Sequence, residues 1–165
     1  MYPDKVSGLW LSLERLLLTL WVGGMLVVGY VVTPVLFSSL GDRMLAGGVA
    51  GRLFSYMSLI GLVCGALLLW VWWLRDGRAV VRDWRLWAVC AMLLIALIGE
   101  FGLAPRMQEI KQAAGVALVP GSELYRQFSR LHGLSSVLFL VNSLLGLGLV
   151  LLPSGPRAGV NPVAG

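Results

Sequence analysis

Four long runs of apolar residues, separated by short polar segments, dominate this chain. An α-helix rises about 1.5 Å per residue, so roughly 20 apolar residues cross the ~30 Å hydrocarbon core of a bilayer. The first run ends without a small-residue cleavage site, and we expect it to remain in the mature protein. The pattern predicts one transmembrane domain over residues 1–152, with spans at residues 14–38, 50–74, 85–104 and 128–152, and a disordered tail over residues 153–165.

The connection between the third and fourth runs, residues 105–130, is the longest. Pro120 and Gly121 divide it into a short amphipathic stretch and a helical lead-in to the fourth span, with Ser122 as the N-cap. The expected fold is therefore all-α. We predict an integral membrane four-helix bundle with a short extramembrane helix between spans three and four.

Composition supports a membrane protein. Hydrophobic residues make up 58% of the chain and charged residues 13%, whereas a soluble domain carries about 25% charged residues. The net charge of +5 comes from Lys and Arg spread over the span ends, which suits lipid headgroups, so we expect a lipid bilayer and no nucleic acid as partner. Cys64 and Cys90 each stand alone inside a span and are interpreted as packing residues.

Orientation follows from the second connection, residues 75–85, which carries four arginines next to two span ends. Positive charges close to span ends favour the cytoplasmic side. With an even number of spans, both termini then lie in the cytoplasm. We predict a multi-pass protein of the inner membrane.

The second run contains small residues spaced three or four apart, with Phe54 among them, which places them along one side of a helix. Small residues let transmembrane helices approach closely. We predict helix packing along this seam, and docking of a membrane partner or of a second copy of the chain is an open alternative. The seam comprises Gly47, Gly51, Ser58, Gly61 and Gly65.

Ionisable residues at the opposite membrane face form the candidate polar site. Glu100 lies 15 residues, about 22 Å of helix, beyond Arg85, and His132 begins the fourth span. Ionisable groups at membrane depth often mark a site. The predicted polar site comprises Glu100, His132, Arg52, Arg126 and Arg130.

Two interpretations of this polar site stay open. In the simpler one, Glu100 pairs with one of the three arginines and clamps helix ends. In the other, the residues form a periplasm-facing pocket that binds a polar or anionic headgroup, or relays protons through His132. A single histidine without a second strong ligand falls short of the usual metal sets, so we expect no metal and no cofactor.

Motifs in the first, third and fourth runs resemble the transmembrane protein 205-like family, whose bacterial branch looks like a domain of unknown function. They include Trp-Val-Gly-Gly at residues 21–24, Thr-Pro-Val-Leu-Phe at 33–37, and Phe-x-x-x-His-Gly-Leu-Ser-Ser at 128–136. The resemblance implies a four-helix multi-pass membrane protein without an established reaction. The positions that match the family pattern are Trp21, Gly24, Pro34, Phe37, Pro105, Phe128, His132, Ser135 and Asn142.

Three functional hypotheses follow. The first, which we favour, is a non-enzymatic protein that binds or passes a small polar solute, ion or lipid headgroup at the polar site. The second is a haem- or quinone-linked redox protein that uses His132. A lone histidine speaks against carrying over the chemistry of copper-resistance D proteins or of membrane protoporphyrinogen oxidases, which the first span resembles more distantly. The third is a structural subunit that docks through the glycine seam.

Overall fold

A computed structural model describes residues 3–115 and 119–152, which contain helices and no strand. The predicted tail at residues 153–165 lies outside the described residues. Four helical segments long and apolar enough to cross a membrane run along most of this described chain. Each predicted span falls within one of them, except for residue 152. The segments are Gly8–Ser39, Arg43–Arg82, Trp84–Ala114 and Glu123–Leu151.

The first segment alternates between α- and π-helix. Pro34 sits in the first turn of the last α-helical piece, lacks a backbone N–H and would clash with the carbonyl four residues earlier. The widened turn before it relieves this conflict, and the Thr33 hydroxyl donates a hydrogen bond to the Val28 carbonyl at 2.8 Å. The pieces are α1 (Pro3–Leu18), a π-helix (Thr19–Gly23), α2 (Gly24–Val27), a second π-helix (Val28–Val32) and α3 (Thr33–Ser39).

The second segment is one unbroken α-helix, α4 (Arg43–Asp76), followed by a 3₁₀ turn (Gly77–Arg82). It begins at the Asp42 carboxylate, which accepts hydrogen bonds from the backbone N–H groups of Met44 and Leu45. It ends at Gly77, whose φ of 56° is a left-handed value that favours glycine. Residues next to each end of α4 therefore determine where the helix begins and ends.

The third segment corrects the predicted connection. The short amphipathic helix exists as α6 (Ala104–Ala114), yet it continues directly from α5 (Trp84–Leu97) through a π-helix (Ile98–Leu103) instead of forming a separate element. Pro105 again lies in the first turn after the π-helix, so the same strain is relieved in the same way as at Pro34.

The fourth segment is α7 (Glu123–Leu151), and it starts where the sequence predicted. The Ser122 hydroxyl accepts a hydrogen bond from the Tyr125 backbone N–H at 3.1 Å, so Ser122 is the N-cap.

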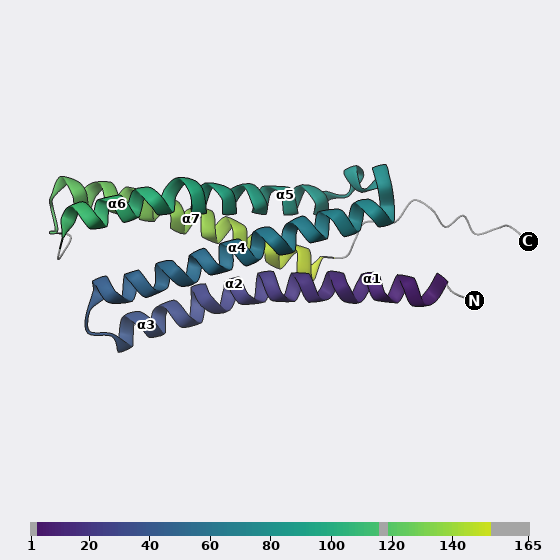
Figure 1. Cartoon of the computed structure of the whole chain (residues 1–165), viewed down its shortest axis with the longest axis horizontal. Helices are drawn as coiled ribbons and strands as arrows, with labels where there is room; N and C mark the ends of the chain where they lie inside the picture. The colour runs from purple at the N-terminus through teal and green to yellow at the C-terminus, as the bar shows by residue number, and fades with distance from the viewer. Residues whose placement is uncertain (1–2, 116–118, 153–165) are drawn as a thin grey trace, which may run out of the picture.

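The four segments lie side by side, and neighbouring segments run in opposite directions (Figure 1). The start of α1 and the end of α7 lie at the same end of the molecule as the 3₁₀ turn after α4. We call this the clamp end. The turn between α3 and α4 and the connection between α6 and α7 lie at the other end, which we call the pocket end.

The main hydrophobic core lies toward the clamp end. Its fully buried members include Leu68, Val89, Met92 and Leu149, and Trp21 packs among them at 3% exposure. These residues come from all four helical segments. The pocket end has fewer large buried side chains.

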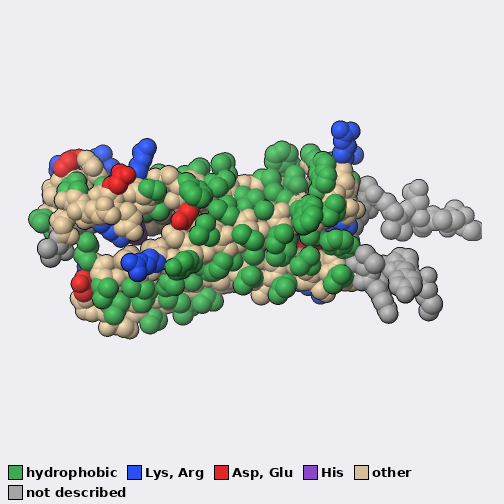
Figure 2. Space-filling model, viewed as in Figure 1, with side chains coloured by type: hydrophobic (Ala, Val, Ile, Leu, Met, Phe, Trp, Pro, Cys, Tyr) green, Lys and Arg blue, Asp and Glu red, His purple; other side chains and the backbone are tan. Residues whose placement is uncertain are grey.

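The outer surface is strongly apolar. Hydrophobic side chains cover the long middle of the molecule, and charged side chains gather at the ends (Figure 2). Only 22–33% of the apolar window of each segment is buried inside the chain. An exposed apolar surface of this extent needs an apolar environment, so the fold is that of a membrane protein.

Candidate functional site

The five residues of the predicted polar site do not form ion pairs with one another. Glu100 lies in the π-helix between α5 and α6 and is half-buried, whereas Arg52, Arg126, Arg130 and His132 are exposed. Arg126 pairs with Glu123 at 2.6 Å, and within the described residues no arginine pairs with Glu100. The interpretation in which Glu100 pairs with an arginine and joins helix ends therefore has no ion pair to support it among the described residues. The role of the five residues as a site stays a prediction.

The depth of each residue can be measured from the clamp end, where Arg75, Arg85 and the Leu149 carbonyl meet around Glu14. Counting 1.5 Å per residue from that level places Glu100 at about 22 Å and His132 at about 26 Å. The three arginines follow at about 28 Å for Arg130 and about 34 Å for Arg52 and Arg126. By this count the five residues spread over about 12 Å along the helices.

His132 stacks on Phe128, one turn earlier in α7, with ring centroids 5.8 Å apart and ring planes 6° apart. Lys111 of α6 also contacts Phe128, with its ammonium 5.5 Å from the centre of the Phe128 ring. The same ammonium donates a hydrogen bond to the Gly47 carbonyl of α4. Lys111 thus connects three segments at the pocket end. Among the described residues, no three His, Cys, Asp or Glu side chains could hold a metal ion together.

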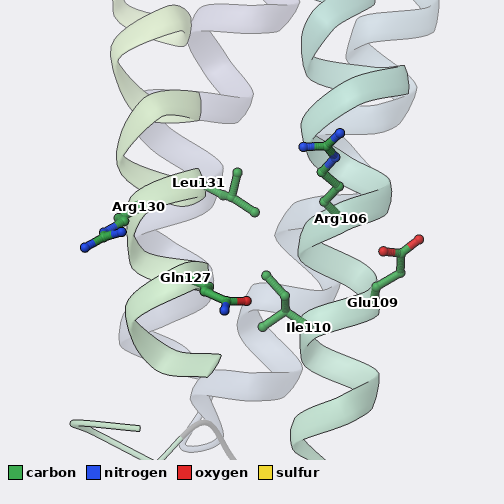
Figure 3. Close-up of a pocket in the computed structure, with 6 residues that line it drawn as sticks. All are labelled: Arg106, Glu109, Ile110, Gln127, Arg130 and Leu131. Carbon is green, nitrogen blue, oxygen red and sulfur yellow. The ribbon is translucent and has the colours of Figure 1, made fainter. Parts of the chain in front are cut away.

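A pocket of about 410 Å³ opens between α6 and α7 at this end. Ile110, Leu131 and Gln127 point into the gap between the two helices, while Arg130 projects from the outer side of α7 and Glu109 from that of α6 (Figure 3). Arg106 stands one turn above Glu109 on α6. The pocket thus has an apolar floor with charged groups around it. Of the predicted polar site, only Arg130 lines it.

The clamp end holds a buried charge cluster that sequence reasoning missed. The Glu14 carboxylate of α1 forms ion pairs with Arg85 of α5 at 2.6 Å and with Arg75 of α4 at 3.1 Å. Arg75 also holds the neighbouring Asp76 at 2.7 Å. The side chains of Glu14 and Arg85 are only 7% and 8% exposed, so this is a buried ion pair between two transmembrane segments.

Further contacts tie the fourth segment and an aromatic ring to the same cluster. The Arg85 guanidinium reaches the Leu149 carbonyl near the end of α7 and lies 5.1 Å from the centre of the Trp72 ring. Carboxylates and guanidinium groups are costly to bury unless they are paired and hydrogen-bonded, and here each has several partners. We call Glu14, Arg75, Asp76 and Arg85 the charge clamp.

The glycine seam packs closely at only two of its predicted positions. A Cβ on Gly61 or on Gly65 would overlap the indole of Trp21, and one on Gly65 would also meet Leu93 at 2.6 Å. Gly47 makes ordinary contact with Phe37, Ser58 is half-buried, and nothing lies within 4 Å of a Cβ on Gly51. Two of the five seam positions are therefore covered by Trp21 of the same chain.

Asn142 is a buried polar residue in the C-terminal half of α7. It is 7% exposed, and its amide N–H donates to the Met25 sulfur at 3.3 Å. Gly24, beside Met25, brings the backbone close to the Met57 side chain of α4. Asn142 and Gly24 thus help to join the first, second and fourth segments. The other positions of the family pattern are the helix-start prolines Pro34 and Pro105, exposed Phe37, half-buried Ser135, and the stacked pair Phe128 and His132.

Residues 16–116 match the family described as Domain of unknown function (DUF4149). The chain belongs to the DUF4149 family. The DUF4149 match contains the Trp21 packing site and the α6 side of the pocket, and it stops before α7 with His132. The likeness to the transmembrane protein 205-like family stays a prediction. No curated protein and no solved structure matches the chain.

Proposed function

We propose that this DUF4149 protein binds the phosphate-bearing headgroup of a membrane lipid in the pocket between α6 and α7. One observation carries the proposal: two arginines, Arg106 and Arg130, stand beside an apolar floor, and neither forms an ion pair with a described residue. Arginine is suited to phosphate because its planar guanidinium donates two parallel hydrogen bonds.

Depth supports a lipid as the ligand. Arg130 and Arg106 lie about 28 Å and 32 Å from the charge clamp, close to the ~30 Å thickness of a hydrocarbon core. With the charge clamp at one interface, the arginines reach the headgroups of the other leaflet. Leu131, at about 27 Å, then faces the glycerol and upper acyl region, where apolar contacts are favourable, whereas Ile110 lies at headgroup level at about 38 Å. The proposal thus assigns the headgroup function expected from the sequence to the pocket between α6 and α7.

The proposal places the protein in the inner membrane as a four-helix bundle with the clamp end in the cytoplasm. The arginine-rich residues 75–85 and the described chain ends lie at that end, as the positive-inside bias favours. The pocket then faces the periplasm. A second copy of the chain or another membrane protein is left open as a partner.

Lipid binding tests the pocket directly. Replacing Arg106 or Arg130 by glutamine is expected to weaken binding of phosphatidylglycerol about fivefold each, because one basic group near anionic lipid contributes roughly 1 kcal/mol. Binding is measured by native mass spectrometry of the purified protein at increasing lipid concentration.

Arg43→Gln is the matched control, because Arg43 is an exposed arginine at the pocket end that does not line the pocket. Its lipid affinity should equal that of the unmodified protein. Equal losses in all three variants would mean that general charge, and not the pocket, attracts the lipid, and the proposal would fail.

Orientation has its own test. Green fluorescent protein fused after the last residue should fluoresce, because it is fluorescent in the cytoplasm. Alkaline phosphatase at the same position should be inactive, because that enzyme is active only in the periplasm. A cysteine at Ser122, in the connection before α7, should react in intact cells with a reagent that does not cross the membrane. An active phosphatase fusion together with an unlabelled Ser122→Cys would reverse the orientation.

A further inference from the structure

Glu109 is the feature of the pocket that phosphate binding leaves unexplained. Seven carboxylate side chains are described, and five of them have a polar partner within the chain. Glu14, Asp76 and Glu123 form ion pairs, and Asp42 and Asp83 cap helices. Glu100 and Glu109 have none among the described residues. Of these two, Glu109 lines the pocket.

Glu109 and Arg106 are placed to bind two opposite charges that are close together. They lie three residues apart on α6, so they are neighbours on one helix surface with a rise of about 4.5 Å between them. They form no ion pair with each other, although this spacing permits one. Both side chains are exposed and both residues line the pocket, so a positive and a negative group lie about one turn apart on α6, with the Glu109 carboxylate toward the outer side of the helix (Figure 3).

We propose that the pocket selects a zwitterionic lipid headgroup that carries a phosphate and a primary ammonium group, as in phosphatidylethanolamine. This inference rests on the headgroup function proposed above. Arg106 binds the phosphate, Arg130 adds positive charge from α7, and the Glu109 carboxylate accepts hydrogen bonds from the ammonium group. Glu109 is then the residue that determines headgroup specificity.

Hydrogen-bonding chemistry distinguishes this headgroup from its alternatives. A primary ammonium donates three N–H bonds, whereas a quaternary ammonium has no N–H to donate to a carboxylate. An anionic headgroup without an amine, such as phosphoglycerol, leaves Glu109 opposite a negative charge. The apolar floor of Ile110 and Leu131 favours a lipid over the free phosphoethanolamine group, because only the lipid brings apolar surface to it.

The test uses the full chain in mild detergent with three lipids of identical acyl chains: phosphatidylethanolamine, phosphatidylcholine and phosphatidylglycerol. Native mass spectrometry should give a two- to fivefold preference for phosphatidylethanolamine over phosphatidylcholine, the size expected of an exposed charge pair. Glu109→Gln should abolish this preference and leave phosphatidylglycerol binding equal or stronger. Glu100→Gln, at the other carboxylate without a polar partner among the described residues and outside the pocket lining, is the control and should keep the preference.

The remaining outcomes separate the two proposals. Binding of phosphatidylglycerol and phosphatidylethanolamine without any effect of Glu109→Gln would overturn the inference and leave the headgroup function standing. Failure to bind any of the three lipids would overturn both. Competition by soluble phosphoethanolamine at the same concentration as the lipid would show a solute site and overturn the lipid as occupant.

Discussion

Replacing Glu14 by glutamine is expected to lower the free energy of unfolding by about 3–5 kcal/mol, the usual effect of removing one partner of a buried ion pair. Glutamine has nearly the same size, so packing is retained while the charge is lost. Arg85, with a side chain only 8% exposed, then loses the carboxylate that neutralises it in a medium of low dielectric. Unfolding by sodium dodecyl sulfate titration in mixed micelles measures the change.

Substitutions at the other residues of the charge clamp should lower the free energy of unfolding by different amounts. Asp76→Asn is expected to have a smaller effect than Glu14→Gln, because the Asp76 side chain is 32% exposed and Arg75 keeps its bond to Glu14. The double variant Glu14→Leu with Arg85→Leu should recover part of the lost stability, since a well-packed apolar pair often replaces a buried ion pair without loss.

Glu123→Gln provides the matched control for the charge clamp. It removes a carboxylate from an ion pair of the same length, 2.6 Å, but both side chains are more than half exposed. Solvent screens such a pair, and the change should stay within about 0.5 kcal/mol. Equal effects of Glu14→Gln and Glu123→Gln would show that burial of the clamp contributes nothing.

Alanine at Gly61 or Gly65 is expected to destabilise the protein by about 1–3 kcal/mol, the typical effect of overpacking a filled core. At either position the new methyl group overlaps the indole of Trp21, a rigid side chain that is 3% exposed and surrounded by the main core. The indole has no free space to move into, so the first and second segments must separate. Steric-trap or detergent unfolding measurements report the loss.

Gly51→Ala is the control within the same seam. Nothing lies within 4 Å of its added methyl group, and alanine favours a helix by up to about 1 kcal/mol over glycine. We expect Gly51→Ala to be neutral or stabilising. If all three glycine variants lost the same stability, a change in lipid contact would explain the result better than packing on Trp21.

The two ends of the molecule have different physical characters. At the clamp end, paired charges and a dense core join all four segments. At the pocket end, α3 and α6 each follow a π-helix and carry a proline in the first turn, and charged groups are exposed around an open pocket. A well-packed end that fixes the helices and a polar end with an open pocket is a division suited to the proposed lipid recognition.

Hydropathy located the four spans because a run of apolar residues as long as a bilayer is thick is a local property of the chain. Local chemistry also predicted the Ser122 cap, because the serine hydroxyl satisfies a backbone N–H only three residues away. The continuation of α6 from the third span was missed. Its polar residues suggested a separate helix, but the π-helix before Pro105 lets one axis continue.

The charge clamp had a weak signal in the sequence. Glu14 precedes the first apolar run, and Arg75 and Arg85 border the second and third runs on the same side. The span pattern predicted that these residues lie at a similar depth. It did not predict that they pair, because depth does not specify which sides of two helices are in contact. The arginines were used only to orient the chain.

By itself, the sequence located four helices long and apolar enough to cross a membrane and the cap of the last one, since both depend on residues close together along the chain. The tertiary structure decided which polar groups meet. Glu14 finds Arg85 71 residues away, Gly61 receives Trp21, and Arg106 lies across a pocket from Arg130. Such contacts depend on the rotation of each helix about its axis, which packing fixes and a hydropathy pattern does not specify.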